Sequence, residues 1–436
     1  MSHLGNAKGA NQKSRREFLK IGATAAVAAS LPIARVAHAG GNDLIRVALI
    51  GCGARGTGAA SQALATKGSV KLVAMADVFP NRIEQSLKYL SKVEEISDRI
   101  DVPPDRQFVG FDAYEKALDC GVDMVLLTTP PHFRPIHYSA AVKAGKQIYI
   151  EKPIAVDAPG IRTIMEANVL AKQKGLQVAV GLQRRHEDHN RKAVKRIRDG
   201  EIGEVIFMRT YYFMPGSISG PIRRPDETEM TYQLRNWLYF TWLSGDHSVE
   251  QSVHAIDVAN WMKNAIPVKA QGVGGRQVRI GQGTGQIFDH GCVEYEYADG
   301  CRYYAFVRQI PGCFQHVGQY AHGTKGVVSV GVGLESLIGR ASGARNAYQQ
   351  QHDRLFAAIR GSGDPVYEAD YGATSTMTAI MGRMALYSGK EITWDEAIKS
   401  DLRLAPARYA MDADPPVLPD NKGNYPVAMP GFTVAW

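Results

Sequence analysis

Short apolar runs alternate with helix-like stretches along the first part of the chain. The clearest run, residues 44–50, leads directly into a glycine-rich turn, and a second run over residues 70–76 ends in Asp77. Further runs of this kind occupy residues 122–129, 147–150 and 177–181. Near-continuous apolar strands that alternate with helices are typical of a parallel sheet covered on both faces. The pattern therefore predicts an α/β domain over residues 43–183.

In the second half of the chain, apolar and aromatic residues alternate with polar ones. Runs with this alternation occupy residues 205–212, 292–297 and 301–307. The last two flank Asp299-Gly300, a dipeptide that favours a tight hairpin. A period of two is typical of a sheet with one packed face. It predicts a second domain over residues 184–400, followed by an extension over residues 401–436 that wraps over the surface or a neighbouring subunit.

The N-terminal segment has three features of an export signal. Residues 14–20 (SRREFLK) hold a twin-arginine pattern, an Ala-rich apolar stretch covers residues 21–33, and residues 37–39 form a small-x-small cleavage site. The apolar stretch is too short for a durable membrane helix. We expect residues 1–39 to be a twin-arginine signal peptide, the translocase to be a partner, and the mature protein to be periplasmic or otherwise exported. This route moves folded proteins, so a cofactor would already be bound.

Composition narrows the class of protein further. At 436 residues the chain is long enough for two globular domains. The net charge of +8 fits either an anionic ligand or merely solvated Lys and Arg, and no basic run with interleaved aromatics suggests nucleic acid. The five cysteines form no CxxC pair, so a zinc knuckle is not expected. Cys292 and Cys301 either pair across the hairpin or remain free thiols.

The glycine-rich turn predicts a dinucleotide site. Gly51, Gly53 and Gly56 form a GxGxxG pattern between a strand and a helix, with Ala54 and Arg55 inside it. Gly51 permits the tight turn, Gly53 lets the backbone approach a diphosphate, and Gly56 lets helix and strand pack closely. The free N–H groups at the start of the helix favour the negative charge of the diphosphate.

Asp77 follows the glycines by about twenty residues, at the end of the second strand. A carboxylate at this position accepts hydrogen bonds from both ribose hydroxyls and repels a 2′-phosphate, which favours NAD over NADP. Arg82 lies close behind it and could offset this repulsion, so NADP stays possible. Lys152 follows the strand at residues 147–150, at the edge of the sheet where ligands of open parallel sheets collect.

Taken together, these residues resemble the Gfo/Idh/MocA family of oxidoreductases (glucose–fructose oxidoreductase, inositol dehydrogenase, rhizopine catabolism). The resemblance rests on the Gly51 to Gly56 turn, Asp77, Thr128-Thr129-Pro130-Pro131 with His137 downstream, Ala144-Gly145-Lys146 and Glu151-Lys152-Pro153. It implies a cofactor site that includes Thr129, Pro130, His137, Glu151 and Lys152. It also implies a second α+β domain whose open, mostly antiparallel sheet carries the substrate face and often an oligomer interface, so we expect a homodimer or homotetramer.

Residues 244–257 of the second domain are rich in ionisable side chains. A helix that begins near the start of this segment would place Glu250, His254 and Asp257 on one face, with His247 one turn earlier. Four such side chains are costly to bury unless they pair or bind something. We also weigh a metal-ligand face of His247, Glu250 and His254, but we expect no metal.

The resemblance gives roles to this face. The matching family positions are an Asp, a His and an Asp, with the His near the reacting hydroxyl. His254 is therefore the candidate general base and Lys152 its partner, while Glu250 stands where Asp is more usual and Ser252 where Gly is common. A purely structural His254, bonded to Asp257, is the alternative. Histidine titrates in the range that alcohol oxidation needs, and an ammonium can stabilise a developing alkoxide.

Aromatic and basic residues suggest a polar, ring-shaped substrate. Trp237 and Tyr211 could stack against a sugar ring or pack in the core. Arg184 and Arg185 could hold a carboxylate or be plain surface charge, and His247 is a further candidate substrate contact.

Three functions follow from these expectations. The first is an NAD(P)-dependent oxidoreductase that transfers hydride to or from a hydroxyl-bearing carbon of a carbohydrate or cyclic polyol, with NAD bound tightly because free cofactor is scarce outside the cytoplasm. The second is a redox-neutral glycosidase or lyase of the same fold, which needs an extra base such as His247 or Glu250. The third is a non-catalytic sugar-binding protein.

Overall fold

The structure, a computed structural model, describes residues 43–331 and 346–435. The chain divides into the units Met1–Gly40 and Gly41–Trp436, and the features that follow belong to the second. The predicted signal peptide lies outside the described residues. Within the described ranges, no helix has both the length and the apolar character that crossing a membrane requires.

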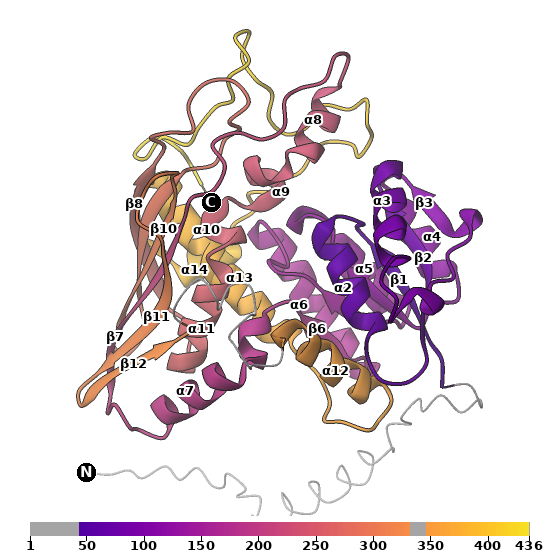
Figure 1. Ribbon diagram of the computed structural model, residues 1–436. Coiled ribbons are helices and arrows are strands. Elements are labelled where there is room, and N and C mark those ends of the chain that lie inside the picture. Colours follow the sequence, from indigo (N-terminus) through magenta and orange to yellow (C-terminus); the bar gives the residue numbers. More distant parts are fainter. Residues whose placement is uncertain (1–42, 332–345, 436) are drawn as a thin grey trace, which may run out of the picture. The chain divides into compact units, whose positions relative to one another are not determined.

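A six-stranded parallel sheet forms the first domain, in the order β3-β2-β1-β4-β5-β6 (Figure 1). Its strands are β1 (Ile45–Ile50), β2 (Val70–Asp77), β3 (Gln107–Val109), β4 (Met124–Leu127), β5 (Gln147–Ile150) and β6 (Val178–Val180). Residues of β1 alternate between two apolar clusters, with Ala48 and Ile50 in one and Val47 and Leu49 in the other. Both faces of the sheet are therefore buried, which explains the continuous apolar runs and confirms the predicted Rossmann-type domain.

Helices connect these strands on both sides of the sheet. They are α2 (Ala54–Leu64), α3 (Pro80–Leu90), α4 (Ala113–Asp119), α5 (Arg134–Lys143) and α6 (Ala158–Gln173). Short 3-10 turns occur at η1 (Ser97–Arg99), η2 (Pro104–Arg106), η3 (Pro131–Phe133), η4 (Gln183–His186) and η5 (Trp237–Tyr239). Parallel strands require such crossover connections, so the sequence order of the elements follows from the sheet.

A seven-stranded sheet forms the second domain, in the order β12-β11-β7-β10-β9-β8-β13. Its strands are β7 (Val205–Met214), β8 (Lys269–Gly275), β9 (His290–Glu296), β10 (Arg302–Gln309), β11 (His316–Gly323), β12 (Gly326–Val330) and β13 (Ile392–Thr393). Every pairing is antiparallel except that of β7 with β10. The predicted β9–β10 hairpin is confirmed, with Gly300 in the left-handed conformation at its turn (φ 81°). The open, mostly antiparallel sheet of the expected α+β domain is thus confirmed.

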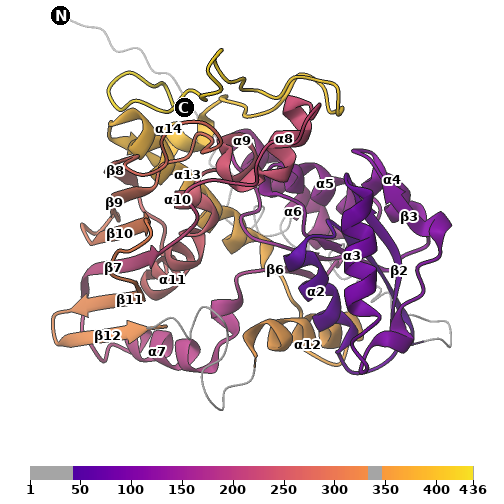
Figure 2. The same ribbon diagram turned by 45° about the horizontal axis from the view of Figure 1, so that its top comes forward.

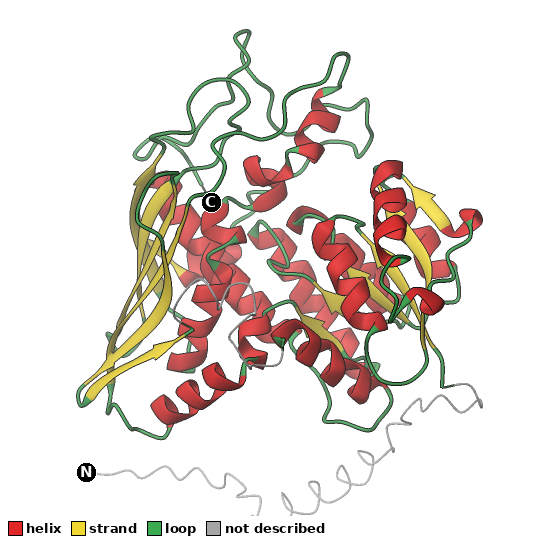
Figure 3. Cartoon of the chain, in the orientation of Figure 1, coloured by secondary structure: helices red, strands yellow, loops and turns green. Residues whose placement is uncertain are grey.

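Helices cover one face of the second sheet, as Figure 3 shows for the described residues. The helices of this part of the chain are α7 (Asp188–Arg198), α8 (Glu229–Arg235), α9 (Thr241–Ser244), α10 (His247–Glu250), α11 (Val253–Lys263), α12 (Ala347–Ile359), α13 (Ala369–Ser388) and α14 (Trp394–Lys399), of which α7, α11 and α13 contact the strands of the second sheet. Helices α11 and α13 pack directly on the strands, while α12 packs on α2 and α13 also packs on α6 of the first domain.

All five cysteines are free thiols, so Cys292 and Cys301 do not pair.

The predicted helix begins near the start of residues 244–257, as expected, with Asp246 as the cap of α10, but it is not continuous, because the segment is divided into α9, α10 and α11. Gly245 ends α9 in the left-handed conformation (φ 82°), and Asp246 follows with φ 79°. The buried Asp246 carboxylate accepts hydrogen bonds from the backbone N–H groups of Ser248 (2.8 Å) and Phe288 (2.9 Å) and from the hydroxyl of Tyr387. These bonds to distant elements outweigh the local helical pattern.

The predicted C-terminal extension contains no helix or strand within residues 401–435. In Figure 2 the C-terminal segment runs along the top of the view, beside α8 and α9. Leu404, Tyr409 and Tyr425 pack into a third apolar cluster with side chains of η3 and of the segment that contains α8 and α9. The hydroxyl of Tyr409 also shares a 2.8 Å hydrogen bond with His132 Nε2. The extension therefore holds the α8–α9 segment of the second domain against the first domain.

Buried histidines predict a loss of stability in acid. Burial lowers the pKa of His132 and His137 to about 3 and holds those of His254 and His352 well below the ordinary value. The folded protein keeps these rings neutral, whereas the unfolded chain takes up protons below about pH 6.5. The free energy of unfolding should therefore fall as the pH drops from about 6.5 toward 3.

His352→Phe should make this pH dependence shallower. The ring of His352 stacks on Tyr149, and both of its nitrogens are buried without a hydrogen-bond partner among the described residues, so Phe keeps the packing and removes one titration. Urea unfolding at several pH values should show the slope reduced by up to about 1.4 kcal/mol per pH unit in the acid range. An unchanged slope would contradict this assignment.

Candidate active site

A cavity of about 830 Å³ lies at the carboxyl ends of the strands of the first domain. Five strands each contribute the residue that follows or ends them, namely Gly51, Asp77, Thr128, Glu151 and Gly181. The opposite wall comes from the second domain and includes Glu250, Gln251 and His254 of the α10–α11 region. The cavity is therefore built between the two domains, where ligands of open α/β sheets bind.

The three glycines of the turn have different structural roles. A Cβ on Gly51 (φ 97°) would lie 2.5 Å from the backbone nitrogen of Thr129, and a Cβ on Gly56 would lie 2.0 Å from the carbonyl oxygen of Gly51. A Cβ on Gly53 would meet no protein atom within 4 Å, although Gly53 lines the cavity. Gly51 and Gly56 are thus needed for packing. Gly53 instead leaves the cavity wall without a side chain where α2 begins. A bare wall beside the free N–H groups of a helix start fits a diphosphate.

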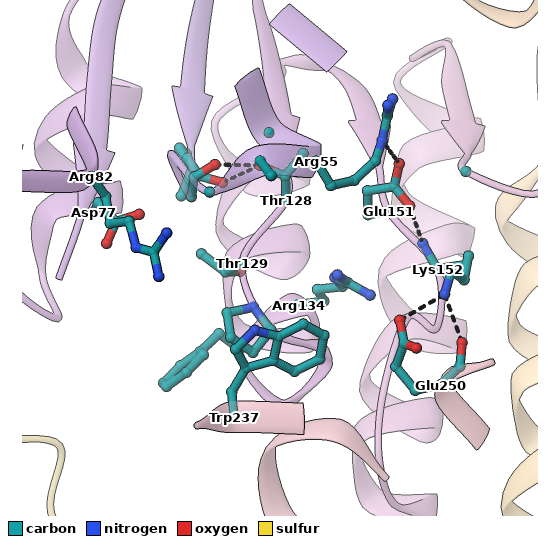
Figure 4. A pocket seen from close by; sticks show the side chains of 18 of the residues that line it. Arg55, Asp77, Arg82, Thr128, Thr129, Arg134, Glu151, Lys152, Trp237 and Glu250 are labelled. Carbon is teal, nitrogen blue, oxygen red and sulfur yellow. Dashed lines mark hydrogen bonds and ion pairs between the residues drawn. The ribbon is translucent and has the colours of Figure 1, made fainter. Parts of the chain in front are cut away.

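Asp77 lines the cavity near Arg82 (Figure 4). Its carboxylate accepts hydrogen bonds from the backbone N–H groups of Cys52 (2.7 Å) and Phe79 (2.9 Å). Burial raises the pKa of Asp77 above its ordinary value, although these N–H groups and Arg82 oppose the shift. The carboxylate is therefore fixed against the glycine turn, in the position expected for contact with a ribose.

Arg55 and Glu151 join the glycine turn to the end of β5. Arg55 Nε donates to Glu151 Oε1 at 2.6 Å, and the hydroxyl of Tyr149 donates to the same oxygen at 2.7 Å. Burial acts to raise the pKa of Glu151, but the charges of Arg55 and Arg134 outweigh it and hold that pKa below the ordinary value. The Arg55 guanidinium also lies 4.6 Å from the ring centre of Tyr348, so α12 closes over this part of the cavity.

Lys152 reaches across the cavity to the second domain. Its Nζ donates to Glu250 Oε1 at 2.7 Å and to the backbone carbonyl oxygen of Glu250 at 2.6 Å (Figure 4). The side chains are only 12% and 9% exposed, so the pair is shielded from bulk water. Two bonds to one residue fix the ammonium at the domain boundary.

His254 lies on the same wall as Glu250. It is the second residue of α11 and is only 8% exposed. Its Nδ1 is buried without a hydrogen-bond partner among the described residues. Burial holds the pKa of His254 well below its ordinary value, and the charges of Lys152 and Arg184 lower it further. The ring is therefore neutral at physiological pH and able to accept a proton.

Two residues of the predicted catalytic face lie elsewhere. Asp257 forms a bidentate ion pair with Arg185, with Nε and Nη2 both at 2.8 Å, and also accepts a hydrogen bond from Ser375. Neither Asp257 nor Arg185 lines the cavity. His247 is fully buried against Asp246, and it does not line the cavity either. Each helix thus contributes one residue to the cavity and one to a buried pair outside it: Glu250 and His247 in α10, and His254 and Asp257 in α11.

The predicted substrate contacts are divided in the same way. Trp237 lines the cavity, whereas Tyr211 lies on the other face of β7, where it stacks on Phe306. The next residue, Tyr212, faces the cavity instead and donates to Gln251 Oε1 at 2.8 Å. Arg184 is buried behind the wall and does not line the cavity.

All predicted cofactor residues line the cavity: Gly51, Gly53, Ala54, Arg55, Gly56, Asp77, Thr129, Pro130, His137, Glu151 and Lys152. Several lining residues were missed from the sequence, and two of them are charged or contact a charged residue of the site. Arg134 lies in the Pro-Pro-His-Phe-Arg-Pro segment after β4, a position that could have been suspected, whereas Tyr348 comes from distant α12 with no sequence signal. Among the described residues, no group of three or more His, Cys, Asp or Glu side chains is arranged to hold a metal ion.

Comparison with known proteins identifies the first domain. Residues 45–182 match the family GFO_IDH_MocA, described as an oxidoreductase family with an NAD-binding Rossmann fold. The scyllo-inositol 2-dehydrogenase (NAD(+)) of Bacillus subtilis (strain 168) is 26% identical over 230 residues, 53% of this chain and 57% of that enzyme. The inositol 2-dehydrogenase of Rhizobium meliloti (strain 1021) is 32% identical over 162 residues, 37% of this chain and 43% of that enzyme. The chain thus spans about half the length of the curated relatives it matches.

Solved structures share the fold across both domains. The scyllo-inositol dehydrogenase from Lactobacillus casei with bound cofactor NAD(H) and scyllo-inositol superimposes with a TM-score of 0.61 at 18% identity, covering 81% of this chain and 99% of that one. The aldose-aldose oxidoreductase from Caulobacter crescentus complexed with glycerol gives a TM-score of 0.58 at 18% identity, covering 80% and 99%. At this identity the likeness shows the architecture alone.

The different roles of Gly53 and Gly56 give a matched pair of variants. Gly53→Ala should fold normally, because the new methyl meets no protein atom within 4 Å, but it should weaken NAD binding at least about tenfold by filling the diphosphate wall. Gly56→Ala should lower the unfolding temperature, because its Cβ would lie 2.0 Å from a carbonyl oxygen. Titration calorimetry and thermal unfolding test both. Wild-type NAD affinity in Gly53→Ala would show that the diphosphate lies elsewhere.

Proposed function

Because residues 45–182 are an NAD-binding domain of the Gfo/Idh/MocA oxidoreductases, we propose that this protein is an NAD-dependent oxidoreductase acting on a hydroxyl-bearing carbon of a carbohydrate or cyclic polyol. The inositol dehydrogenases among its relatives support this substrate class. The observation that carries the proposal is the meeting of Lys152, Glu250 and His254 in the cavity that the glycine turn opens.

The residues of the chain supply the proton and charge chemistry of such a reaction. When bound, the nicotinamide ring supplies the hydride acceptor or donor. Lys152, held by Glu250, donates a hydrogen bond to the substrate oxygen and stabilises the negative charge that develops on it. His254, neutral at physiological pH, accepts the hydroxyl proton during oxidation and returns it during reduction. The buried walls limit the access of water to these groups.

Asp77 and the closure of the cavity support NAD as a tightly held cofactor. The carboxylate of Asp77 favours ribose hydroxyls over a 2′-phosphate, while Arg82 beside it leaves NADP possible. The contact of Arg55 with Tyr348 brings α12 against the glycine turn, which supports slow release of a bound dinucleotide. Slow release suits an enzyme that acts where free cofactor is scarce.

Export and self-association complete the proposal. The twin-arginine pattern at residues 14–20 supports export through the twin-arginine translocase to the periplasm. Among the described residues, helices cover only one face of the seven-stranded sheet, and the other face supports a homo-oligomer. A redox-neutral glycosidase would need a second base in the cavity. Of the two residues considered for that task, His247 does not line the cavity, and Glu250 lines it but is held in the ion pair with Lys152. The oxidoreductase therefore agrees better with the described site.

Replacing either reactive side chain should stop hydride transfer. Lys152→Ala and His254→Ala should each lower the rate at least about 100-fold, since each removes a proton-handling or charge-stabilising group, while NAD still binds. The readout is the nicotinamide absorbance band in the presence of a panel of sugars and polyols. Lys143→Ala, on the exposed side of α5, is the control and should leave the rate unchanged. Undiminished turnover in either test variant would remove that residue from the mechanism.

The depressed pKa of His254 predicts the pH profile. The ring stays deprotonated well below the ordinary value of 6.5, so kcat/KM for oxidation should remain level as the pH falls through 6.5 and drop only at lower pH. Initial rates in overlapping buffers would show this. An acid limb centred at 6.5 or higher would show that the group that limits the rate is not an imidazole with a depressed pKa, and it would contradict the assignment of His254 as the base.

A further inference from the structure

The inner end of the cavity contains one more cation than it has carboxylates. Arg55 pairs with Glu151, and Lys152 pairs with Glu250. Arg134, the first residue of α5, also lines the cavity and lies between Thr129 and Glu250 in Figure 4. It forms no ion pair within 4.0 Å among the described residues, so its charge is not matched by a partner of its own.

The hydrogen bonds of Arg134 leave part of its guanidinium unused. Nη1 donates to the backbone carbonyl oxygen of Pro153, and Nε is buried with no hydrogen-bond partner among the described residues. The side chain is only 4% exposed. Burial lowers the pKa of Arg134 to about 10, with the charges of Glu151 and Glu250 opposing the shift, so the group is still a cation at neutral pH. It is a buried donor with spare capacity that borders the cavity.

A second guanidinium adds positive charge behind the same wall. Arg184 is 2% exposed, and its three side-chain nitrogens have no hydrogen-bond partner among the described residues. Its charge reaches the cavity, because it helps to lower the pKa of His254. Glu187 acts on Arg184 in the opposite sense, but burial raises the pKa of Glu187 to about 7, so this carboxyl is only partly ionised near neutral pH. The excess positive charge therefore remains.

This imbalance favours an anionic ligand. A buried cation without a counter-ion is costly, and the oxidised nicotinamide would bring a further positive charge to the same end of the cavity. A carboxylate matches the planar fork of a guanidinium and forms strong, charge-assisted hydrogen bonds with it. A neutral polyol would leave Arg134 unmatched.

We propose that the substrate carries a carboxylate, as in an aldonic or uronic acid, and that Arg134 binds it beside Lys152. This inference rests on the proposed oxidoreductase function and narrows its substrate class. Arg134 is a specificity-determining residue in this account, and Arg184 strengthens the positive field without touching the substrate.

Matched pairs of acid and neutral compounds test the inference. The probes are D-glucuronate with D-glucose, D-galacturonate with D-galactose, and D-gluconate with D-sorbitol, titrated into protein loaded with NAD. Trp237 lines the cavity, so its fluorescence reports binding, with Trp237→Phe as the blank. At least one acid should bind more tightly than its neutral counterpart. Arg134→Gln should weaken that acid at least about 30-fold and the neutral compound less than about 3-fold.

Two further variants separate charge from folding. Arg134→Lys keeps the cation and should retain most of the preference for the acid, which a merely structural Arg134 would not explain. Arg191→Gln removes the same charge from the exposed side of α7, outside the cavity, and should leave the ratio of acid to neutral affinity unchanged. Thermal unfolding of each variant shows whether it is folded.

The outcomes distinguish this inference from the proposed function. Equal affinity for acid and neutral compounds, no binding of any acid, or an equal loss for both in Arg134→Gln would overturn the carboxylate assignment. Hydride transfer from neutral sugars would then still uphold the oxidoreductase. Conversely, acids that bind through Arg134 but never change the nicotinamide absorbance would leave the anion site standing and overturn the proposed function.

Discussion

The ion pair between Lys152 and Glu250 determines how the two domains form one site. Lys152 stands at the end of β5, and Glu250 ends α10, so the pair crosses the boundary between the parallel sheet and the second domain. A buried ion pair adds little to stability, because desolvation of both charges opposes their attraction. Its value here is positional. Among the described residues, the ammonium donates hydrogen bonds to the carboxylate and the backbone carbonyl of Glu250 and to no other acceptor, so it is held at the wall of the cavity that the second domain supplies.

The position of Glu250 depends in turn on a buried polar network around Asp246. That carboxylate caps α10. It also accepts hydrogen bonds from the backbone N–H of Phe288, which lies just before β9, and from the hydroxyl of Tyr387 in α13. Because α13 also packs on α6 of the first domain, the network and the Lys152 pair are supported by the same helix. Glu250 at the end of α10 and His254 near the start of α11 line the cavity, whereas Asp257, further along α11, pairs with Arg185.

The sequence predicts the first domain well, because its strands are buried on both faces and its glycines have strict steric roles. Residues whose position follows from strand ends, such as Asp77 and Lys152, are placed correctly in the cavity for the same reason. The division of residues 244–257 could not be predicted, since bonds to distant elements outweigh its helical pattern. The choice of Tyr212 over Tyr211 depends on the register of β7, where a shift of one residue reverses the face.

The most direct measurement of the central claim is a crystal structure of the protein with NAD bound. The account predicts that the diphosphate lies against Gly53 at the start of α2 and that C4 of the nicotinamide faces the space between Lys152 and His254. A nicotinamide ring directed away from these two side chains, or a cofactor bound outside this cavity, would contradict the account.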